Sequence, residues 1–398
     1  MDDTRRMTAD ERERAARLRR FRRLTWGQRS RLLANRIERR LGRTRLLWGP
    51  RTLDVVPTHR CNLRCVGCVQ YLIEGPKDLT VDFFRELLDE SAPWAIQYRL
   101  CSLGEPFMNK DVPEMLRLAA ERGIGVNTMT NGMLVTDELA DFIVGQCQVD
   151  IFSFSIDGAT AETCERLRRG LTWDRLLGAI ASVDEAKRRH GTPDPVLQAN
   201  FTAMRENIEE LPELVRLVAK IGIEDINVNY LTVEARTALE DSLFESPDEQ
   251  ARVFAEARRV ADDLGIVLHL PPDISDVDVQ TRCVLPWDTL IIDTDGTARM
   301  CYASWEETVG NVRTDGGILK VWNNAIYRKV RETIETPRPF YRYCSQCGRR
   351  VGFSRIEAHV GKNEDNGGSY SFDWERQDAP PRPAGSRLLN PDSGNDEA

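Results

Sequence analysis

Short apolar runs alternate with longer amphipathic stretches through the middle of the chain. The apolar runs, which favour β-strands, lie at residues 53–57, 96–100, 126–129, 151–156, 196–204 and 226–231. Between them, apolar residues recur at helical spacing over residues 81–90, 112–122, 137–146, 173–190 and 208–221. Six β units joined by helical crossovers predict an α/β fold with a parallel sheet, whose ligands bind at the carboxyl ends of the strands.

The first 50 residues interrupt this pattern. Residues 1–51 contain 17 Arg, no Lys and six acidic residues, and Leu33, Ile37 and Leu41 recur at helical spacing. We expect a basic helical extension over residues 1–50 that docks its apolar stripe on the main domain and leaves its Arg face in solvent. The same charge also suits an anionic lipid, a nucleic acid or an acidic partner.

Composition limits the class of protein. With 398 residues, of which 41% are hydrophobic, the chain can bury a substantial core. It has no uncharged apolar window long enough to span a bilayer and no secretory signal, so we expect a cytoplasmic protein. Residues 361–398 are rich in Gly, Asn, Asp, Ser and Pro, which predicts a disordered tail. In a reducing compartment, ten cysteines are more typical of metal or redox sites than of a disulfide scaffold.

Three cysteines stand just after the first predicted strand, in the sequence THRCNLRCVGC. Cys61, Cys65 and Cys68 have the spacing C-x3-C-x2-C. Four thiolates complete a tetrahedral zinc site or an ordinary iron–sulfur cluster, whereas three leave one iron open to bind a ligand. The spacing therefore favours an iron–sulfur cluster with an open position, and a zinc ion with His59 as fourth ligand is the alternative.

From about residue 51 to residue 352 the chain resembles radical S-adenosylmethionine (SAM) enzymes. The resemblance implies a partial (β/α)6 TIM-like barrel over residues 51–270 and a [4Fe–4S] cluster held by Cys61, Cys65 and Cys68. In that family the open iron binds the amino and carboxylate groups of SAM. One-electron cleavage of SAM then releases a 5'-deoxyadenosyl radical, which abstracts a hydrogen atom from the substrate.

Polar segments that follow successive strands resemble the SAM-binding motifs of this family. SLGEP follows the second strand, TNG the third and SFSIDG the fourth, and RLRRG lies further along. The resemblance implies that a glutamate receives the SAM ammonium, that polar side chains bind the ribose, and that an arginine pairs with the SAM carboxylate. The residues implied are Gly104, Glu105, Asn131, Ser155, Asp157, Arg168 and Asn200, with Arg166 or Arg169 as alternatives to Arg168.

Four further cysteines form a second group near the C-terminus. The segment between Cys283 and Cys301 alternates apolar and polar residues around Asp-Gly, which predicts a β-hairpin, and a helical stretch leads to Cys344 and Cys347. The layout resembles the auxiliary-cluster domain called SPASM, or twitch in its shorter form. Over residues 271–352 it implies one auxiliary [4Fe–4S] cluster held by these four cysteines, and a structural zinc site is the alternative.

Three cysteines lie outside both groups. We interpret Cys147 and Cys164 as small core residues. Cys101 ends the second predicted strand beside SLGEP. Core packing and a role as hydrogen-atom donor to a substrate radical are both open for its thiol.

An auxiliary cluster with four protein ligands has no open iron, so its expected role is electron transfer. We therefore predict a radical SAM oxidoreductase that dehydrogenates an alcohol carbon of a small polar substrate, such as an aminocyclitol or sugar-like intermediate of natural-product biosynthesis. A flavodoxin or ferredoxin is its expected electron donor. The alternatives are a sugar epimerase that uses Cys101, a maturase that modifies a ribosomally made peptide, and a non-catalytic iron–sulfur or zinc protein that binds nucleic acid.

Overall fold

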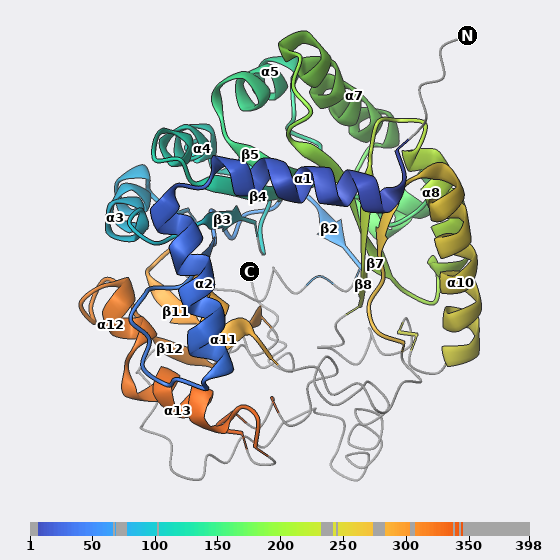
Figure 1. Ribbon diagram of the computed structural model, residues 1–398. Coiled ribbons are helices and arrows are strands. Elements are labelled where there is room, and N and C mark those ends of the chain that lie inside the picture. Colours follow the sequence, from blue (N-terminus) through green and yellow to red (C-terminus); the bar gives the residue numbers. More distant parts are fainter. Residues whose placement is uncertain are drawn as a thin grey trace, which may run out of the picture.

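The computed structural model of the chain describes residues 7–66, 68, 78–101, 103–231, 242–243, 246–273, 283–302, 307–336, 339–341 and 344. Within these residues a sheet of ten strands forms the centre of the molecule and curves into an open barrel (Figure 1). In spatial order the strands are β12 (Thr308–Asn311), β11 (Thr297–Arg299), β10 (Thr289–Ile292), β1 (Thr52–Val55), β3 (Gln97–Leu100), β4 (Gly125–Thr130), β5 (Val149–Ser155), β7 (Val196–Ala203), β8 (Asp225–Tyr230) and β9 (Val267–His269).

The strands from β10 to β9 all run parallel to their neighbours, which confirms the parallel α/β fold predicted from the alternating pattern. Helices cover the outer face of this sheet (Figure 1), as where Tyr98 of β3 packs edge-on against Phe84 with ring centroids 5.6 Å apart. The covering helices are α3 (Val81–Ser91), α4 (Val112–Glu121), α5 (Asp137–Gln146), α7 (Trp173–His190), α8 (Leu211–Val218) and α10 (Pro247–Leu264).

Two local features differ from the prediction. The helix expected at residues 208–221 begins as a 3-10 turn at Ile208–Glu210 and is α-helical only over α8, which has a proline in its first turn. One further unit, α10 followed by β9, was not predicted, because a strand of three residues shows too little alternation to be detected.

The C-terminal strands continue the barrel sheet. β10 pairs in parallel with β1, with Thr289 opposite Thr52, and β11 and β12 then add antiparallel strands. The β10–β11 pair confirms the hairpin predicted between the first two cysteines of the C-terminal group. Three short helices accompany these strands: α11 (Leu285–Asp288), α12 (Ile318–Trp322) and α13 (Ala325–Thr333).

A buried arginine joins this C-terminal part to the N-terminal segment. Arg331 of α13 donates from Nε to the Pro286 carbonyl at 2.7 Å and from Nη1 to the Thr44 carbonyl at 2.9 Å. Its guanidinium also lies 4.4 Å from the centroid of the Trp322 ring. Because these contacts hold a guanidinium that is only 3% exposed, they fix the C-terminal helices against the chain that leads into β1.

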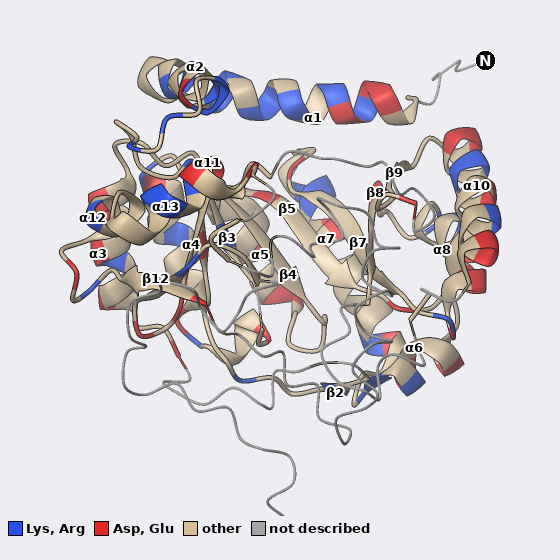
Figure 2. Cartoon of the chain, turned by 90° about the horizontal axis from the view of Figure 1, so that it is seen from below, with Lys and Arg blue, Asp and Glu red and all other residues tan. Residues whose placement is uncertain are grey.

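The basic extension forms two helices, α1 (Ala9–Arg23) and α2 (Trp26–Arg40), each begun by a capping box. They form a layer across the amino ends of the strands (Figure 2). Arg23 of α1 pairs with Asp150, at the start of β5, at 3.0 Å. Gln28 of α2 donates to the Ala95 carbonyl, just before β3, at 3.4 Å. The extension therefore docks on the barrel, as expected.

The side of α2 that docks is not the expected one. Leu33, Ile37 and Leu41 are 60%, 49% and 64% exposed, so the apolar stripe faces solvent. The buried residues of α2 are Gln28 and Glu38. The reason is that this side of α2 meets backbone polar groups: Gln28 and Asn35 donate to the Ala95 and Trp287 carbonyls, and Glu38 accepts from the Leu47 N–H, which leucines could not do.

Some expectations fall outside the described residues. The tail predicted at residues 361–398 lies there, and so does Cys347. Within the described part of the chain, no helix combines the length and the apolar character needed to cross a membrane.

Replacing Arg23 should destabilise the protein. Burial raises the pKa of Asp150, and the charges of Arg23 and Arg20 lower it. Arg23→Ala leaves this carboxylate buried with less compensating charge. Because the Arg23 side chain is 32% exposed, we expect a modest loss of about 1–2 kcal/mol in the free energy of unfolding at pH 7. Chemical denaturation measures this loss.

The pH dependence gives a second readout of the same pair. A carboxyl whose pKa is raised by folding binds more protons in the folded state, so its contribution to stability falls as the pH rises through that range. The penalty of Arg23→Ala should therefore be largest at neutral pH and shrink below the folded-state pKa of Asp150. Arg14→Ala, on the exposed side of α1, is the matched control. Equal penalties for the two variants at all pH values would contradict this account.

Candidate functional site

The three-cysteine segment leaves β1 at the carboxyl end of the barrel. Its middle part forms a short strand, β2 (Arg64–Cys65), which pairs antiparallel with β6 (Arg168–Arg169) just after α6 (Ala161–Leu167). This pairing sets Cys65 directly opposite Arg168. The layer of α1 and α2 lies at the other end of the strands (Figure 2).

The three thiols influence one another. Burial raises the pKa of Cys65 to about 11; the charge of Arg168 opposes this rise, and Cys68 and Cys61 add to it. Burial also raises the pKa of Cys61. The three sulfur atoms therefore share one partly buried region, in which a bound cation or metal cluster would stabilise the thiolate forms.

The donor set suits a cluster better than a single ion. Within the described residues, no three side chains among His, Cys, Asp and Glu converge on one ion position. The three cysteines of a cubane bind three different irons, so their sulfur atoms need not meet at one point. His59, the alternative fourth zinc ligand, has its Nε2 atom 2.6 Å from Asp293 Oδ1. His59 is thus engaged with Asp293, and the three-cysteine cluster stays a prediction from the spacing.

Side chains on both flanks fix the cysteine segment. Arg60 donates from Nε and Nη2 to the two carboxylate oxygens of Asp78, at 2.9 and 2.6 Å. On the other side, Asp293 follows β10 and contacts both His59 and Arg299, the latter at 2.8 Å. Burial acts to raise the pKa of Asp293, but the hydrogen bond and charge of His59, with Arg299, lower it overall. The carboxylate thus ties the segment to the C-terminal hairpin.

Gly104 allows the cysteine segment to pack closely against the end of β3. A Cβ atom at Gly104 would lie 2.3 Å from the Thr58 carbonyl oxygen and 2.7 Å from that of Arg60. The next residue, Glu105, donates its N–H to the Arg60 carbonyl at 2.8 Å. The chain's own backbone, directly before Cys61, therefore approaches Gly104 as closely as only a glycine allows.

Glu105 connects this contact at the end of β3 to the end of β4. Its carboxylate is 2% exposed and accepts from Thr130 Oγ1 at 2.6 Å and from the Asn131 N–H at 2.7 Å. Burial raises its pKa, and these hydrogen bonds act in the opposite direction. Asn131 in turn donates from Nδ2 to Asn62 Oδ1 at 2.8 Å, inside the cysteine segment. Sequence reasoning missed Asn62, which carries no distinguishing pattern.

Asp157 and Arg168 form a buried ion pair beside Cys65. Arg168 Nε lies 2.7 Å from Asp157 Oδ2, and their side chains are only 11% and 5% exposed. Arg168 also donates from Nη1 to Cys65 Sγ at 3.9 Å. The second oxygen of Asp157 accepts from the Thr202 N–H at 2.8 Å. Asp157 therefore orients Arg168 toward the cysteines. Arg166 instead pairs with Glu206 and is half-exposed.

The inner face of the sheet is polar. Asn200 lies opposite Ser155 in the β5–β7 register, and its Oδ1 accepts from Asn227 and Asn229 at 2.9 and 3.0 Å. A second row nearer the amino ends links Ser153, Gln198, Asp225 and His269 from four neighbouring strands. Alternation in these strands therefore separates an apolar outer face from a hydrogen-bonding interior.

Cys101 lies near the charged part of this interior. Burial raises the pKa of its thiol, with a further rise from Asp54 and an opposing effect of Arg99. Arg99 Nη1 lies 3.4 Å from Asp54 Oδ2, and its side chain is 40% exposed whereas that of Asp54 is 1% exposed. Cys101 is therefore a neutral thiol beside an accessible guanidinium. Cys164 is buried in the core and Cys147 packs against the core, as interpreted from the sequence.

The C-terminal cysteines gather around α13. Burial raises the pKa of Tyr327; Arg331 opposes this rise, and Tyr341, Cys301 and Cys283 add to it. Cys344 is 7% exposed, and its N–H donates to the Tyr341 carbonyl at 3.0 Å. Three of the four predicted ligands of the auxiliary cluster are thus close to two neighbouring tyrosines.

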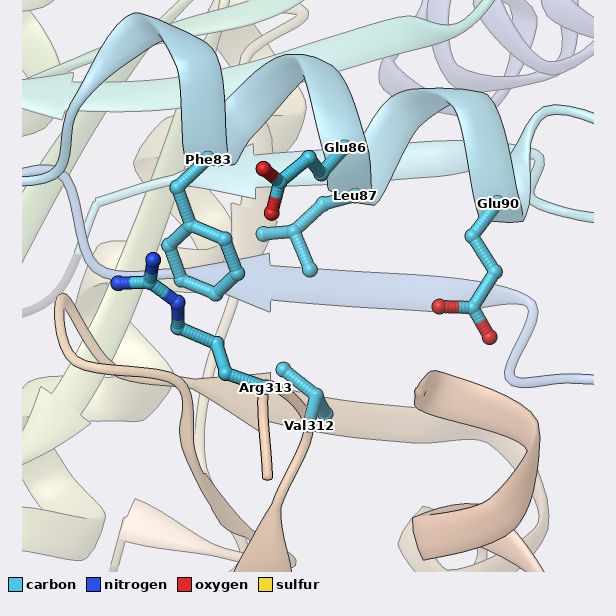
Figure 3. A pocket seen from close by; sticks show the side chains of 6 residues that line it. All are labelled: Phe83, Glu86, Leu87, Glu90, Val312 and Arg313. Carbon is cyan, nitrogen blue, oxygen red and sulfur yellow. The ribbon is translucent and has the colours of Figure 1, made fainter. Parts of the chain in front are cut away.

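One surface cavity lies away from both cysteine groups. It has a volume of 290 Å³ and opens between α3 and the residues that follow β12 (Figure 3). The Arg313 guanidinium lies 4.7 Å from the centroid of the Phe83 ring at one end, and the rest is lined by Glu86, Leu87, Glu90 and Val312. Because α3 covers the outer face of the sheet, this cavity is separate from the polar interior.

Two sequence profiles match the chain. That of the radical SAM superfamily matches residues 55–218, and that of an iron–sulfur cluster-binding domain, SPASM, matches residues 283–348. These ranges contain the first and the second cysteine group. A radical SAM domain followed by a SPASM domain implies a [4Fe–4S] cluster that binds SAM and auxiliary iron–sulfur binding.

Named proteins match over both domains. The chain is 25% identical to the tungsten-containing aldehyde ferredoxin oxidoreductase cofactor-modifying protein of Pyrococcus furiosus, over 74% of this chain and 86% of that protein. It is 26% identical to mycofactocin maturase MftC of Mycolicibacterium smegmatis, over 73% and 74% of the two chains. It is also 26% identical to the PqqA peptide cyclase of Granulibacter bethesdensis, over 74% and 78%.

A solved structure has the same fold. Streptococcus suis SuiB bound to S-adenosylmethionine superimposes with a TM-score of 0.60 at 15% identity, over 78% of this chain and 72% of that chain. The fold, the two matched domains and the position of the three cysteines agree with one another. This chain therefore belongs to the radical SAM superfamily and carries a SPASM iron–sulfur cluster-binding domain.

Proposed function

We propose that this chain is a maturase that modifies a peptide by radical SAM chemistry. The observation that carries the proposal is the similarity, across both domains, to proteins named as a mycofactocin maturase and a PqqA peptide cyclase. The similarity extends over about three quarters of this chain and includes the SPASM domain as well as the barrel.

The polar interior of the barrel supports a peptide substrate. Asn227 and Asn229 present amide groups around Asn200, and Gln97 donates to Asn127 at 3.0 Å on the neighbouring strands. An amide side chain both donates and accepts hydrogen bonds, and so does each peptide group of a bound chain. The amide side chains of the interior can therefore hydrogen-bond to the backbone of a bound peptide, so that the peptide's N–H and C=O groups remain satisfied.

The accessible guanidinium of Arg99 offers a second contact for a peptide substrate. Asp54 is buried and holds Arg99 by an ion pair, which leaves part of the guanidinium free for a substrate group. A guanidinium binds a carboxylate or a carbonyl oxygen through paired donors. We infer that Arg99 binds an acidic or carbonyl group of the peptide next to the reacting carbon.

The ligand roles follow from the positions of the residues. We assign Cys61, Cys65 and Cys68 to the SAM-binding cluster, and Arg168 to the SAM carboxylate. When bound, this cluster supplies the electron that cleaves SAM to a radical able to abstract a hydrogen atom. Asp157 orients Arg168, and Glu105 holds Asn131 against the cysteine segment. Ser155 and Asn200 remain candidates for the ribose.

The auxiliary cluster is assigned to Cys283, Cys301, Cys344 and Cys347. The positions of Cys283 and Cys301 near Tyr327, and of Cys344 beside Tyr341, support this assignment, and Cys347 lies outside the described residues. Electron transfer is the expected role of a cluster with a complete protein ligand set.

The peptide proposal replaces the small ring substrate expected from the sequence. That expectation rested on the number of C-terminal cysteines, a feature that reports on electron transfer and not on what the barrel binds. The named maturases favour the alternative that was drawn from the same sequence, a peptide substrate. A flavodoxin or ferredoxin remains the expected electron donor.

Replacing the three cysteines together should abolish SAM cleavage. Without thiolates the open-iron cluster has no ligands, so Cys61→Ala/Cys65→Ala/Cys68→Ala should lose about four irons and form no 5'-deoxyadenosine with SAM and dithionite under anaerobic conditions. Cys147→Ala, which changes a thiol packed against the core, is the matched control and should retain both. Continued SAM cleavage by the triple variant would disprove the ligand assignment.

Asp157→Asn should weaken SAM binding while the protein stays loaded with iron. The substitution removes the charge that orients the buried Arg168 guanidinium, and we expect the Kd for SAM to rise by about tenfold or more. Arg166→Gln, in which a half-exposed arginine loses its pair with Glu206, is the control and should leave SAM affinity unchanged. Equilibrium dialysis measures affinity, and iron analysis confirms loading. If Arg166→Gln weakened SAM binding and Asp157→Asn did not, the contact with the SAM carboxylate would belong to Arg166.

The substrate class is tested with a short peptide encoded beside the gene. Incubation with SAM and dithionite should change the peptide mass, and Arg99→Met should cut this modification by about tenfold or more while sparing SAM cleavage without peptide. Repeating the reaction in heavy water distinguishes epimerisation from other modifications. Epimerisation would add one deuterium to the peptide, and Cys101→Ala would abolish this incorporation. An unmodified peptide together with dehydrogenation of an aminocyclitol or sugar would reject the maturase proposal.

A further inference from the structure

The outer side of α2 carries an aligned set of exposed apolar side chains. Residues spaced three and four apart lie on one side of a helix, and here this side is opposite Gln28 and Asn35, which contact the barrel. Soluble proteins seldom leave so many large apolar side chains exposed in a row. The apolar ridge, as we name it, consists of Trp26, Leu33, Ile37 and Leu41, which are 84%, 60%, 49% and 64% exposed.

The charge around the ridge has one sign. Glu38 is the only acidic residue between Trp26 and Trp48; it is 5% exposed, and its Oε1 accepts from the Leu47 N–H at 2.8 Å. Leu47 and Trp48, which follow α2, lie on another side of the helix, where the Arg31 guanidinium is 4.9 Å from the centroid of the Trp48 ring. The arginines of this segment are Arg29, Arg31, Arg36, Arg39, Arg40, Arg43 and Arg45.

We propose that the apolar ridge binds the surface of an anionic lipid bilayer, with α2 lying parallel to the membrane. The aliphatic side chains would enter the boundary of the acyl region while the flanking arginines contact lipid phosphates. Trp26, at the N-terminal end of the ridge, is the residue type that anchors proteins at this boundary. Charge complementarity therefore selects an anionic membrane as the occupant.

The shape of this face favours lipid over a folded protein partner. α2 is part of the outermost layer on its side of the molecule, so the ridge projects instead of lining a groove (Figure 2). A deformable lipid surface accommodates a projecting helix, whereas a protein partner must supply a matching groove. The inward side of α2 is held by Gln28 and by Asn35, which donates to the Trp287 carbonyl. The helix therefore need not leave the barrel to bind.

The orientation leaves the active site accessible. α1 and α2 lie at the amino ends of the strands, and the cysteine segment leaves β1 at the carboxyl end. Ion pairs of Arg19 and Arg23 with Asp194, at 3.3 and 3.1 Å, hold α1 in place along this end. Membrane binding through the ridge would therefore turn the cysteine end toward the aqueous phase, whatever the substrate is.

Co-sedimentation of the full-length, cluster-loaded protein with vesicles tests the proposal. Binding is expected to mixed vesicles of phosphatidylglycerol and phosphatidylcholine, and it should weaken with salt and be minor with phosphatidylcholine alone. Leu33→Glu/Ile37→Glu places charges on the exposed ridge without disturbing buried contacts, and should lower binding by about tenfold or more. The control, Ala255→Glu/Arg258→Gln, makes the same change in net charge on the exposed side of α10 and should bind like the wild type.

Three outcomes would overturn the proposal. One is a wild-type protein that fails to bind the anionic vesicles. Another is equal binding by wild type and Leu33→Glu/Ile37→Glu, which would place lipid contact elsewhere. The third is a wild-type protein that elutes as a dimer in size-exclusion chromatography and does not bind vesicles, while the ridge variant elutes as a monomer and the control as a dimer. The ridge would then join two copies of this chain. Loss of vesicle binding in the ridge variant alone, with a melting temperature equal to that of the control, supports the proposal.

Discussion

The close backbone contact at Gly104 is the constraint on which the cysteine site depends. The carbonyl oxygens of Thr58 and Arg60 occupy the space that any side chain at this position would need. The end of β3 therefore holds the segment that leaves β1, and Glu105 extends the connection to Thr130 and Asn131 at the end of β4. Three adjacent strand ends thus behave as one rigid support for the thiols, which is what a site that must orient both a cluster and its ligand requires.

Buried carboxylates do most of this connecting. Glu105, Asp157 and Asp293 are each almost inaccessible to solvent, and each accepts hydrogen bonds or ion pairs from residues far away in sequence. A carboxylate has two oxygens and about four lone-pair positions, so it can accept hydrogen bonds from the protein and still accept one from a ligand. The positions that resemble SAM-binding motifs therefore also have structural partners within the chain, and Asp157 shows this most directly, because it fixes Arg168 beside Cys65.

Periodicity in the sequence predicted the parallel sheet, its helical cover and the end at which the cysteines lie, since these depend on local patterns of apolar residues. It did not predict contacts such as Asn62 with Asn131 or His59 with Asp293, which the three-dimensional path of the chain creates. It also located the apolar stripe of α2 but assigned it to the wrong side. A stripe shows that one side of a helix differs from the other, whereas the docked side depends on what the barrel presents, here the carbonyl groups before β3 and β10.

The polar docking of α1 and α2 has a consequence for substrate access. These helices cover the amino ends of the strands, and α1 contacts β9, so a substrate cannot approach the interior from that side. The row formed by Ser153, Gln198 and Asp225 consequently lies at the covered end of the interior, while Arg99 and Cys101 lie nearer the end at which the cysteine segment begins. A substrate that enters from the other end passes the cysteine segment first and reaches the hydrogen-bonding row last.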